Sequence, residues 1–380
     1  MQILMLDLKR QYEYMRRDIN PVIRKCLKRQ QWILGPEVKK FEEKISEYLG
    51  VKHCLGVSSG TDALVLCLRA LAIKLKGREY FDRDDRIITT PFTFIATGDA
   101  ILRAGATPVF VDIDPVTYNI NVNKVKDYLI SASNVVGIVP VHFYGQACDM
   151  DDILRIAKEC KLFVVEDVAQ AFGGKWKERK LGSMGDINAF SFFPSKNLGG
   201  FGDGGMVATN NNEMVQITEL LRRHGGKDGR NAEYIGYNAR LDALQAGVLL
   251  AKMKYIEEFN DKKRKNAEIY NEGLKAIKGI MLPASLREAH HVYHQYTIRV
   301  LNGRRDELQR YLNANGIGTR VYYPTPLHKM EVIQGKCETL ESLKEAEKAS
   351  REVLSLPIDP LFTQKELKKV IKYIAIKLKI

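Results

Sequence analysis

The sequence lacks the apolar runs and cysteine patterns that mark several classes of protein. No stretch approaches the roughly 18 consecutive apolar residues that cross a bilayer, and the first residues, MQILMLDLKRQYEYMRR, contain too short an apolar segment for a signal peptide. The cysteines are scattered without a C-x-x-C pair, which argues against a zinc knuckle and against a disulfide framework. We therefore expect a cytoplasmic protein whose cysteines are reduced core residues.

An excess of basic residues gives the chain a formal net charge of +13, but no basic block stands out. The lysines alternate with glutamates in segments such as EVKKFEEKISEYLG and LESLKEAEKASREV, a pattern typical of solvated helix faces. We find neither a basic face nor a helix-turn-helix signature, so nucleic-acid binding is disfavoured. A positive field would still raise the association rate of an anionic small substrate.

The histidines show no spacing that indicates a metal site, so we expect no metal. Three of the seven fall in AHHVYHQY at residues 289–296, which we interpret as the surface of a strand edge.

Short apolar runs alternate with amphipathic segments between about residues 50 and 210. Seven runs are strand-like and rich in Val, Ile and Phe: HCLGVSS, RIITTPF, TPVFVDI, VVGIVPVHF, KLFVVED, INAFSFF and GGMVATN. Helix-like stretches such as TDALVLCLRALAIKLK and DMDDILRIAKEC lie between them. This alternation predicts a mostly parallel sheet with helices on both faces and functional groups at the carboxyl ends of its strands.

The last third of the chain has a different pattern. Residues 240–277 read as one long helix, or as a helix broken near Asn260, and short strands and helices of a smaller α+β unit follow. A length of 380 residues also favours two unequal domains. We place the boundary near residue 250, with a large domain at 1–250 and a small C-terminal domain at 251–380.

The segment FSFFPSKNLGGFGDGG, residues 190–205, contains one lysine between an aromatic run and several glycines. The glycines permit positive φ and close approach of the backbone to another group. Lys196 in this setting is either a solvent-exposed loop residue or a buried amine. Burial lowers the pKa of a lysine, so the neutral amine can form a Schiff base and then act as a general base.

Three further features precede Lys196 at strand ends. SSGTDAL, residues 58–64, presents a hydroxyl and the free N–H groups of a helix start, which suit a phosphate or simply cap the helix. Phe94 follows a strand, where it stacks on a planar ring or belongs to the core. Asp167 ends an apolar strand, where it pairs with a ring nitrogen, caps a helix or forms a salt bridge to the following helix. In this order the four features match the phosphate, ring face, nitrogen and aldehyde of pyridoxal phosphate.

The chain resembles the DegT-type nucleotide-sugar aminotransferases, which belong to the fold type I pyridoxal-phosphate enzymes. The resemblance covers nearly the whole chain. Its motifs are WILGPEVKKFEEKISEYLG, SSGTDAL, GATPVFVDIDPVTYNI, PVHFYGQACDMDDI, EDVAQAFGG, SFFPSKNLGGFGDGG, GYNARLDALQAGVL and YYPTPLH. It implies an α/β fold, with a large domain built on a mixed, mostly parallel sheet between helices and a smaller α+β C-terminal domain.

The resemblance also implies roles for individual residues. Lys196 matches the family's Schiff-base lysine, and Asp167 matches the partner of the pyridine nitrogen. The other matched positions are Gln170 near the ring hydroxyl, Gly60, Thr61 and Ser191 at the phosphate, and Phe94 as the stacking aromatic. Asn238 matches an asparagine that reaches the phosphate of the neighbouring subunit, which implies a homodimer with shared active sites.

The implied reaction is transfer of an amino group from glutamate to a keto group of a nucleotide-linked sugar, for an amino sugar of a surface polysaccharide or a glycosylated product. LDLKRQY, HFYGQ and SFFPSKNLG resemble family members that act at the 3-keto position more than members that act at the 4-keto position. Family members that remove a hydroxyl carry histidine in place of the lysine, so Lys196 disfavours a dehydratase. The remaining alternative is a non-catalytic regulator.

The candidate contacts for the nucleotide diphosphate are Arg240, Arg320, Tyr322, Tyr323 and His328. Each of these residues either contacts the nucleotide or has only a structural role.

Overall fold

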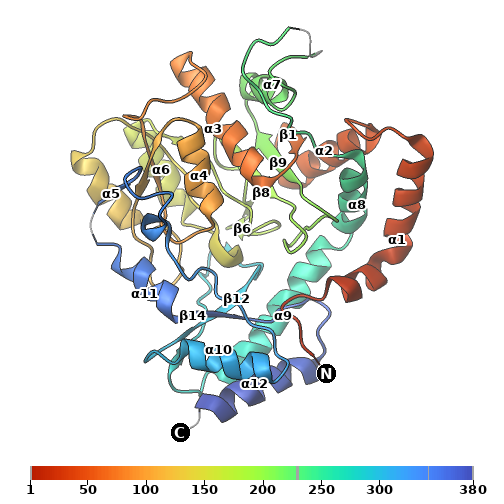
Figure 1. Cartoon of the computed structure of the whole chain (residues 1–380), viewed down its shortest axis with the longest axis vertical. Helices are drawn as coiled ribbons and strands as arrows, with labels where there is room; N and C mark the ends of the chain where they lie inside the picture. The colour runs from red at the N-terminus through yellow and green to blue at the C-terminus, as the bar shows by residue number, and fades with distance from the viewer. Residues whose placement is uncertain (1, 228–230, 341, 379–380) are drawn as a thin grey trace.

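The computed structural model (Figure 1) describes residues 2–227, 231–340 and 342–378, and it contains a sheet of five parallel strands. The strand order is β13, β3, β2, β4, β5, and every neighbouring pair is parallel. The strands are β2 (Arg86–Thr89), β3 (Thr107–Phe110), β4 (Val135–Ile138), β5 (Phe163–Val164) and β13 (Glu338–Thr339). The predicted parallel sheet is thus confirmed.

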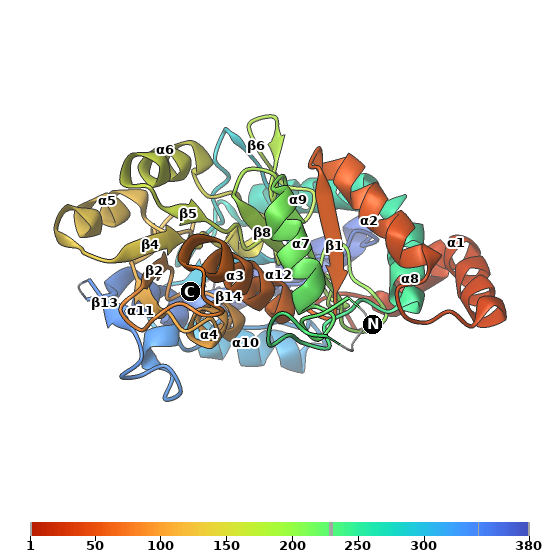
Figure 2. The same cartoon turned by 90° about the horizontal axis from the view of Figure 1, so that it is seen from above.

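Helices cover both faces of this sheet, because successive side chains of a strand point to opposite sides. Ile87 packs in a core cluster with α3, whereas the next residue, Ile88, packs in a second cluster with α6. Figure 2 shows α3 and α4 on one side of the strands and α5 and α6 on the other. The four helices are α3 (Gly60–Lys76), α4 (Ile95–Arg103), α5 (Val122–Ser131) and α6 (Met150–Cys160).

A second sheet continues the layer in antiparallel order. It consists of β1 (His53–Val57), β9 (Gly205–Thr209) and β8 (Ile187–Ser191), with β9 in the middle. Asp167 joins the two sheets, because its backbone forms parallel bridges with Val141 on one side and Ala189 on the other. The end of the β5 segment is therefore held between strands of both sheets.

The long helix expected at 240–277 is two helices, α8 (Ala243–Met253) and α9 (Ile256–Leu274). The break lies at Lys254 and Tyr255, not near Asn260. The Tyr255 backbone N–H donates to the Lys252 carbonyl, 3.0 Å away, in a tight turn, and both break residues bind Asp18 through their side chains. Asn260 lies within α9, where its amide donates to the Phe172 carbonyl and accepts a hydrogen bond from Asn197.

The C-terminal segments form an antiparallel sheet, β10 (Ile280–Met281), β12 (Tyr296–Val300) and β14 (Val353–Leu356), which packs with α9, α10 (Arg305–Ala314) and α12 (Gln364–Leu378) at the lower end of Figure 1. Ile3, from the other end of the chain, is buried in the same core. The other elements are α1 (Leu8–Arg29), α2 (Pro36–Leu49), α7 (Asn212–Leu221), α11 (Lys344–Glu352), β6 (Lys175–Trp176), β7 (Arg179–Lys180), β11 (Ala289–His290), η1 (Phe143–Gly145) and η2 (Leu327–Lys329).

The cysteines are free thiols, but they are not all core residues. Cys26, Cys54, Cys67 and Cys148 are buried, whereas Cys337 is half-buried and Cys160 is exposed at the end of α6. Among the described residues, no helix combines the length and apolar character needed to span a bilayer, and no group of three or more acidic, histidine or cysteine side chains is placed to hold a metal ion.

Candidate active site

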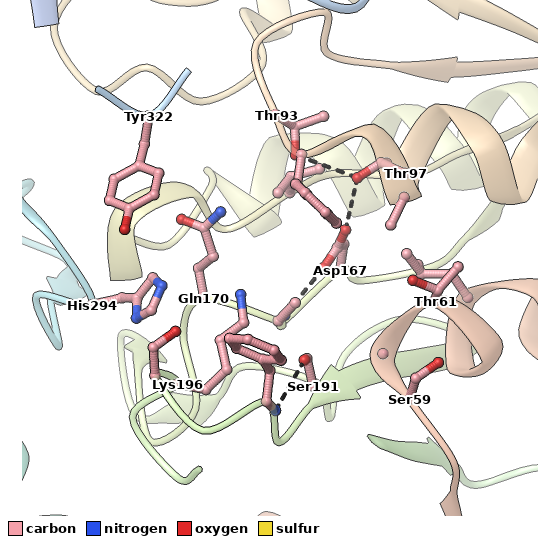
Figure 3. A pocket seen from close by; sticks show the side chains of 18 of the residues that line it. Ser59, Thr61, Thr93, Thr97, Asp167, Gln170, Ser191, Lys196, His294 and Tyr322 are labelled. Atoms are coloured by element: carbon pink, nitrogen blue, oxygen red, sulfur yellow. Dashed lines mark hydrogen bonds between the residues drawn. The ribbon is translucent and has the colours of Figure 1, made fainter. Parts of the chain in front are cut away.

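A cavity of about 450 Å³ opens where the parallel and antiparallel sheets meet. Its wall includes the start of α3, the start of α4, the end of the β5 segment and the turn that follows β8. Most of the residues predicted for the cofactor line it: Gly60, Thr61, Phe94, Asp167, Gln170, Ser191 and Lys196. Figure 3 shows several of these side chains directed into one space.

One wall is the first turn of α3. Ser59 caps the helix, since its hydroxyl accepts the Asp62 N–H at 3.0 Å. Gly60 directly faces Ser191, and a Cβ at position 60 would lie 2.6 Å from the Ser191 Cβ. The absence of a side chain at position 60 therefore allows the helix start to approach β8. The first N–H groups of a helix have no acceptor within the helix, so this turn is suited to bind an anion.

Asp167 is a buried carboxylate at the junction of the two sheets. One oxygen accepts the Thr97 hydroxyl at 2.9 Å, and the other accepts the Ala169 N–H at 3.1 Å. Burial raises the pKa of this carboxyl group, and both hydrogen bonds act against that rise. A cationic group next to Asp167 would relieve the cost of holding its charge away from water.

Lys196 lies in the turn after β8, where its backbone N–H donates to the Phe193 carbonyl at 2.8 Å. The residue is partly exposed to the cavity, but the protein around its amine lowers the pKa to about 8, and the charge of Asp167 acts in the opposite direction. Figure 3 shows the amine between Asp167 and Gln170. The site thus contains an amine that is easily deprotonated beside a buried acid.

Gln170 and Phe94 complete the predicted cofactor set within the cavity. Gln170 is buried, and its side-chain oxygen accepts the Tyr144 N–H at 3.0 Å, which fixes the orientation of the amide. Phe94 is 51% exposed, and its ring centre lies 5.9 Å from that of Tyr323 at a tilt of 41°. The Phe94 ring is therefore accessible to a planar group.

The structure does not bring every predicted residue into the cavity. Tyr322 and Tyr323 line it, but Asn238, Arg240, Arg320 and His328 do not. Asn238 is exposed and accepts a hydrogen bond from Arg240. Arg320 is exposed beside β14, and the His328 imidazole lies 3.1 Å from Glu347.

Several lining residues were missed by sequence reasoning. The Thr97 hydroxyl donates to Asp167, and the Thr93 hydroxyl oxygen lies 3.3 Å from that of Thr97. The two threonines are four residues apart in TFIAT, and this helical spacing could have indicated that they lie together. His294 is buried in the cavity wall, so the interpretation of AHHVYHQY as strand-edge surface was wrong for this residue and for the buried His291. Both are enclosed by elements distant in the sequence, which a local pattern does not reveal.

Comparisons with known proteins decide the family. The profile of the DegT/DnrJ/EryC1/StrS aminotransferase family matches residues 13–375. The chain belongs to this family. Its relatives within it include the "Pleiotropic regulatory protein" of Geobacillus stearothermophilus, with 41% identity over 99% of this chain and 98% of the relative. The UDP-N-acetyl-3-dehydro-alpha-D-glucosamine 3-aminotransferase of Acidithiobacillus ferrooxidans is 39% identical over 97% and 96% of the two chains.

Solved structures of the DegT/DnrJ/EryC1/StrS family share the whole fold. DesV of Streptomyces venezuelae, solved in complex with a ketimine intermediate, matches with a TM-score of 0.93 and 35% identity, over 100% of this chain and 99% of the other. NtdA of Bacillus subtilis, solved with the bound cofactor PMP, matches with a TM-score of 0.89 and 32% identity. The match covers 100% of this chain and 86% of the NtdA chain. The chain is therefore a fold type I aminotransferase of this family.

Proposed function

We propose that the protein is a pyridoxal-phosphate-dependent aminotransferase that converts the 3-keto group of a nucleotide-linked sugar to an amine, with glutamate as the amino donor. The central observation is that Lys196 and Asp167 face one cavity at the junction of the two sheets. The PMP bound to NtdA supports the cofactor, and the 3-aminotransferase named among the relatives supports the 3-keto position.

The residues of the cavity fit pyridoxal phosphate by their chemistry. Thr61, Ser191 and the first turn of α3 offer hydroxyl and N–H donors to a phosphate, and Phe94 offers an accessible ring face. The carboxylate of Asp167 is suited to bind a protonated ring nitrogen. The side-chain amide of Gln170 is suited to bind the ring hydroxyl. When bound, pyridoxal phosphate supplies an electron-withdrawing ring and carries the amino group between the two substrates.

Lys196 holds and moves protons in this proposal. With a pKa of about 8, a minor but kinetically useful fraction of its amine is neutral near neutral pH. The neutral amine is a nucleophile toward the cofactor aldehyde and a base that carries a proton between the reacting carbons. Asp167 keeps a proton on the ring nitrogen, because a buried carboxylate is best stabilised by a cationic partner.

The nucleotide would bind towards the open side of the cavity, with Tyr322 as the candidate contact already in the wall. Arg320, two residues earlier, is exposed and available to a diphosphate. Arg240 and His328 stay predictions, since their present partners are Asn238 and Glu347.

A homodimer would account for Asn238, which lies outside the cavity of its own chain. Large apolar side chains are exposed near the site and elsewhere, including Phe94, Phe193, Phe201 and Ile235. We expect Asn238 to enter the partner's site. Lys196→Ala and Asn238→Ala subunits, inactive alone, should regain activity when coexpressed, because one site of the mixed dimer keeps both residues. Failure of this rescue would contradict the shared site.

Absorbance spectroscopy tests the cofactor role. Protein mixed with pyridoxal phosphate should show an absorbance band that Lys196→Ala abolishes and that Lys158→Ala, an exposed lysine on α6, leaves intact. Glutamate should then convert the bound cofactor to its amino form, and a 3-keto nucleotide sugar should reverse the change. Without a lysine-dependent band the proposed site is wrong.

The relative named as a regulatory protein raises the alternative of a non-catalytic function. A cavity with a deprotonatable lysine beside a buried aspartate favours catalysis. A protein that binds the cofactor but undergoes neither half-reaction would support the regulatory alternative.

A further inference from the structure

His294 is a buried imidazole in the wall of the active-site cavity, and the roles proposed above leave it unused. The residue is 7% exposed, and its Nδ1 atom has no hydrogen-bond partner among the described residues. In Figure 3 the ring lies on the side of the Lys196 amine opposite to Asp167. The Nδ1 atom is itself enclosed by protein, whereas Nε2 is not, so Nε2 is the ring nitrogen that a ligand in the cavity can reach.

Two lysines act on the charge of the His294 ring. Burial, followed by the charges of Lys196 and Lys263, lowers the pKa of His294 well below its ordinary value. Lys263 lies on α9 and is itself buried, and burial lowers its pKa to about 8. The charge of Asp359 opposes the lowering of the Lys263 pKa, and its carboxylate also accepts hydrogen bonds from Gln11 and from the Asp7 and Leu361 N–H groups.

His294 offers a hydrogen-bond donor to an anion on this side of the cavity. The described residues that line the cavity include no arginine, and Lys196 and His294 are their basic members. In the proposed function Lys196 reacts with the cofactor and carries protons. His294 is therefore the basic residue that remains to contact a negatively charged substrate group.

The amino donor provides such a group at the right place. The α-carboxylate of an amino acid is attached to the carbon that carries the reacting amine, and this amine must come to the cofactor at Lys196. A sugar diphosphate, in contrast, carries its charge several bonds away from the keto carbon. Resting on the aminotransferase function proposed above, we infer that His294, supported by the positive charge of Lys263, binds the α-carboxylate of the amino donor.

Separate measurement of the two half-reactions tests this inference. His294→Leu removes both ring nitrogens, whereas His294→Gln keeps a polar group near the position of Nε2. With the cofactor in its aldehyde form, His294→Leu should need about 10- to 100-fold more glutamate for half-maximal conversion, the range expected for a lost hydrogen bond to a charged group. His294→Gln should recover part of this loss. The reverse half-reaction with keto sugar should change less than about threefold.

Binding measured without turnover provides a second readout. 2-Oxoglutarate keeps the carboxylates of glutamate but has no amine, so it cannot react with the aldehyde form of the cofactor. Calorimetric titration of the loaded enzyme with 2-oxoglutarate should show the same weakening for His294→Leu. Lys263→Met should weaken this binding severalfold, and Lys265→Met, an exposed lysine on the same helix, should not.

The outcomes separate the two proposals. If His294→Leu impairs the sugar half-reaction and spares the glutamate half-reaction, His294 contacts the sugar and the inference is overturned. Unchanged binding of 2-oxoglutarate in both His294 variants overturns it too. If wild-type protein converts neither glutamate nor keto sugar, the proposed function itself fails. Should His294→Leu not fold, His294→Gln and Lys263→Met still decide the matter.

Discussion

Glu166 lies 3.0 Å from the Nε2 atom of His142, and both side chains are fully buried. Glu166 immediately precedes Asp167 in the chain. The Nδ1 atom of His142 accepts the Cys148 N–H at 3.1 Å, so the proton is on Nε2 and is donated to Glu166. The His142 backbone N–H also donates to the Asp167 carbonyl at 3.1 Å. The pair therefore fixes the backbone that carries the candidate ring-nitrogen partner.

Glu166→Gln should destabilise the protein by about 3 kcal/mol, since removal of one member of a buried pair leaves unsatisfied groups. The Glu166 carboxylate also accepts the N–H groups of Gly182, Met184 and Gly185, and an amide NH₂ would face one of these donors. Urea unfolding of Glu166→Gln beside Glu159→Gln, an exposed residue on α6, measures the effect. Equal stability of the two variants would contradict this account.

Thr97→Val should lower kcat about 5- to 10-fold in the cofactor-loaded enzyme. The Thr97 hydroxyl donates to Asp167 and lowers the pKa of that carboxyl group, so its loss favours the protonated acid, which is a poorer partner for a ring nitrogen. Thr97→Ser keeps the hydroxyl and should retain most activity. Steady-state kinetics across neutral pH provide the comparison, and a fully active Thr97→Val would show that the hydrogen bond is dispensable.

Gly60→Ala should reduce stability by about 1–3 kcal/mol, because the new Cβ would lie 2.6 Å from the Ser191 Cβ. Removal of that contact should restore the lost stability, so Gly60→Ala combined with Ser191→Gly should unfold closer to Ser191→Gly alone. Thermal or urea unfolding of the four proteins forms a double-mutant cycle. Additive effects would mean that the two positions do not clash.

Glu366 stabilises the contact between α1 and α12 in a pH-dependent way. Hydrogen bonds from Arg10 hold its pKa at about 2, below the ordinary 4.5, so its contribution is complete above pH 4.5 and is lost as the pH falls toward 2. Glu366→Gln should cost about 1.5–3 kcal/mol near neutral pH. The difference from wild type in urea unfolding should shrink below about pH 4, and a constant difference would refute the assignment.

The sequence predicted the order of elements well, because hydrophobic periodicity reports local burial. Each of the seven apolar runs between residues 50 and 210 contains one of the strands β1, β2, β3, β4, β5, β8 or β9. Lys196 and Asp167 were expected at strand ends, and the parallel bridges of Asp167 to Val141 and Ala189 bring these ends together. The roles of these residues and the domain boundary near residue 250 stay predictions.

Features set by distant partners were not predictable from local pattern. The break between α8 and α9 involves Asp18, more than 230 residues away in the chain. His294 is buried by segments that the local pattern of AHHVYHQY does not include, and Cys160 is exposed because it lies on the solvent side of the last turn of α6. In each case the tertiary neighbours determined the outcome.

Asp167 forms bridges to both Val141 and Ala189, so the cavity wall exists only when the two sheets are docked. A chain in which either sheet has not assembled cannot offer the acid and the lysine side by side. Binding of the cofactor would then select for the fully assembled layer and add its own free energy to that state. Cofactor uptake during refolding would accordingly report the completion of the whole α/β layer and not the formation of any single strand.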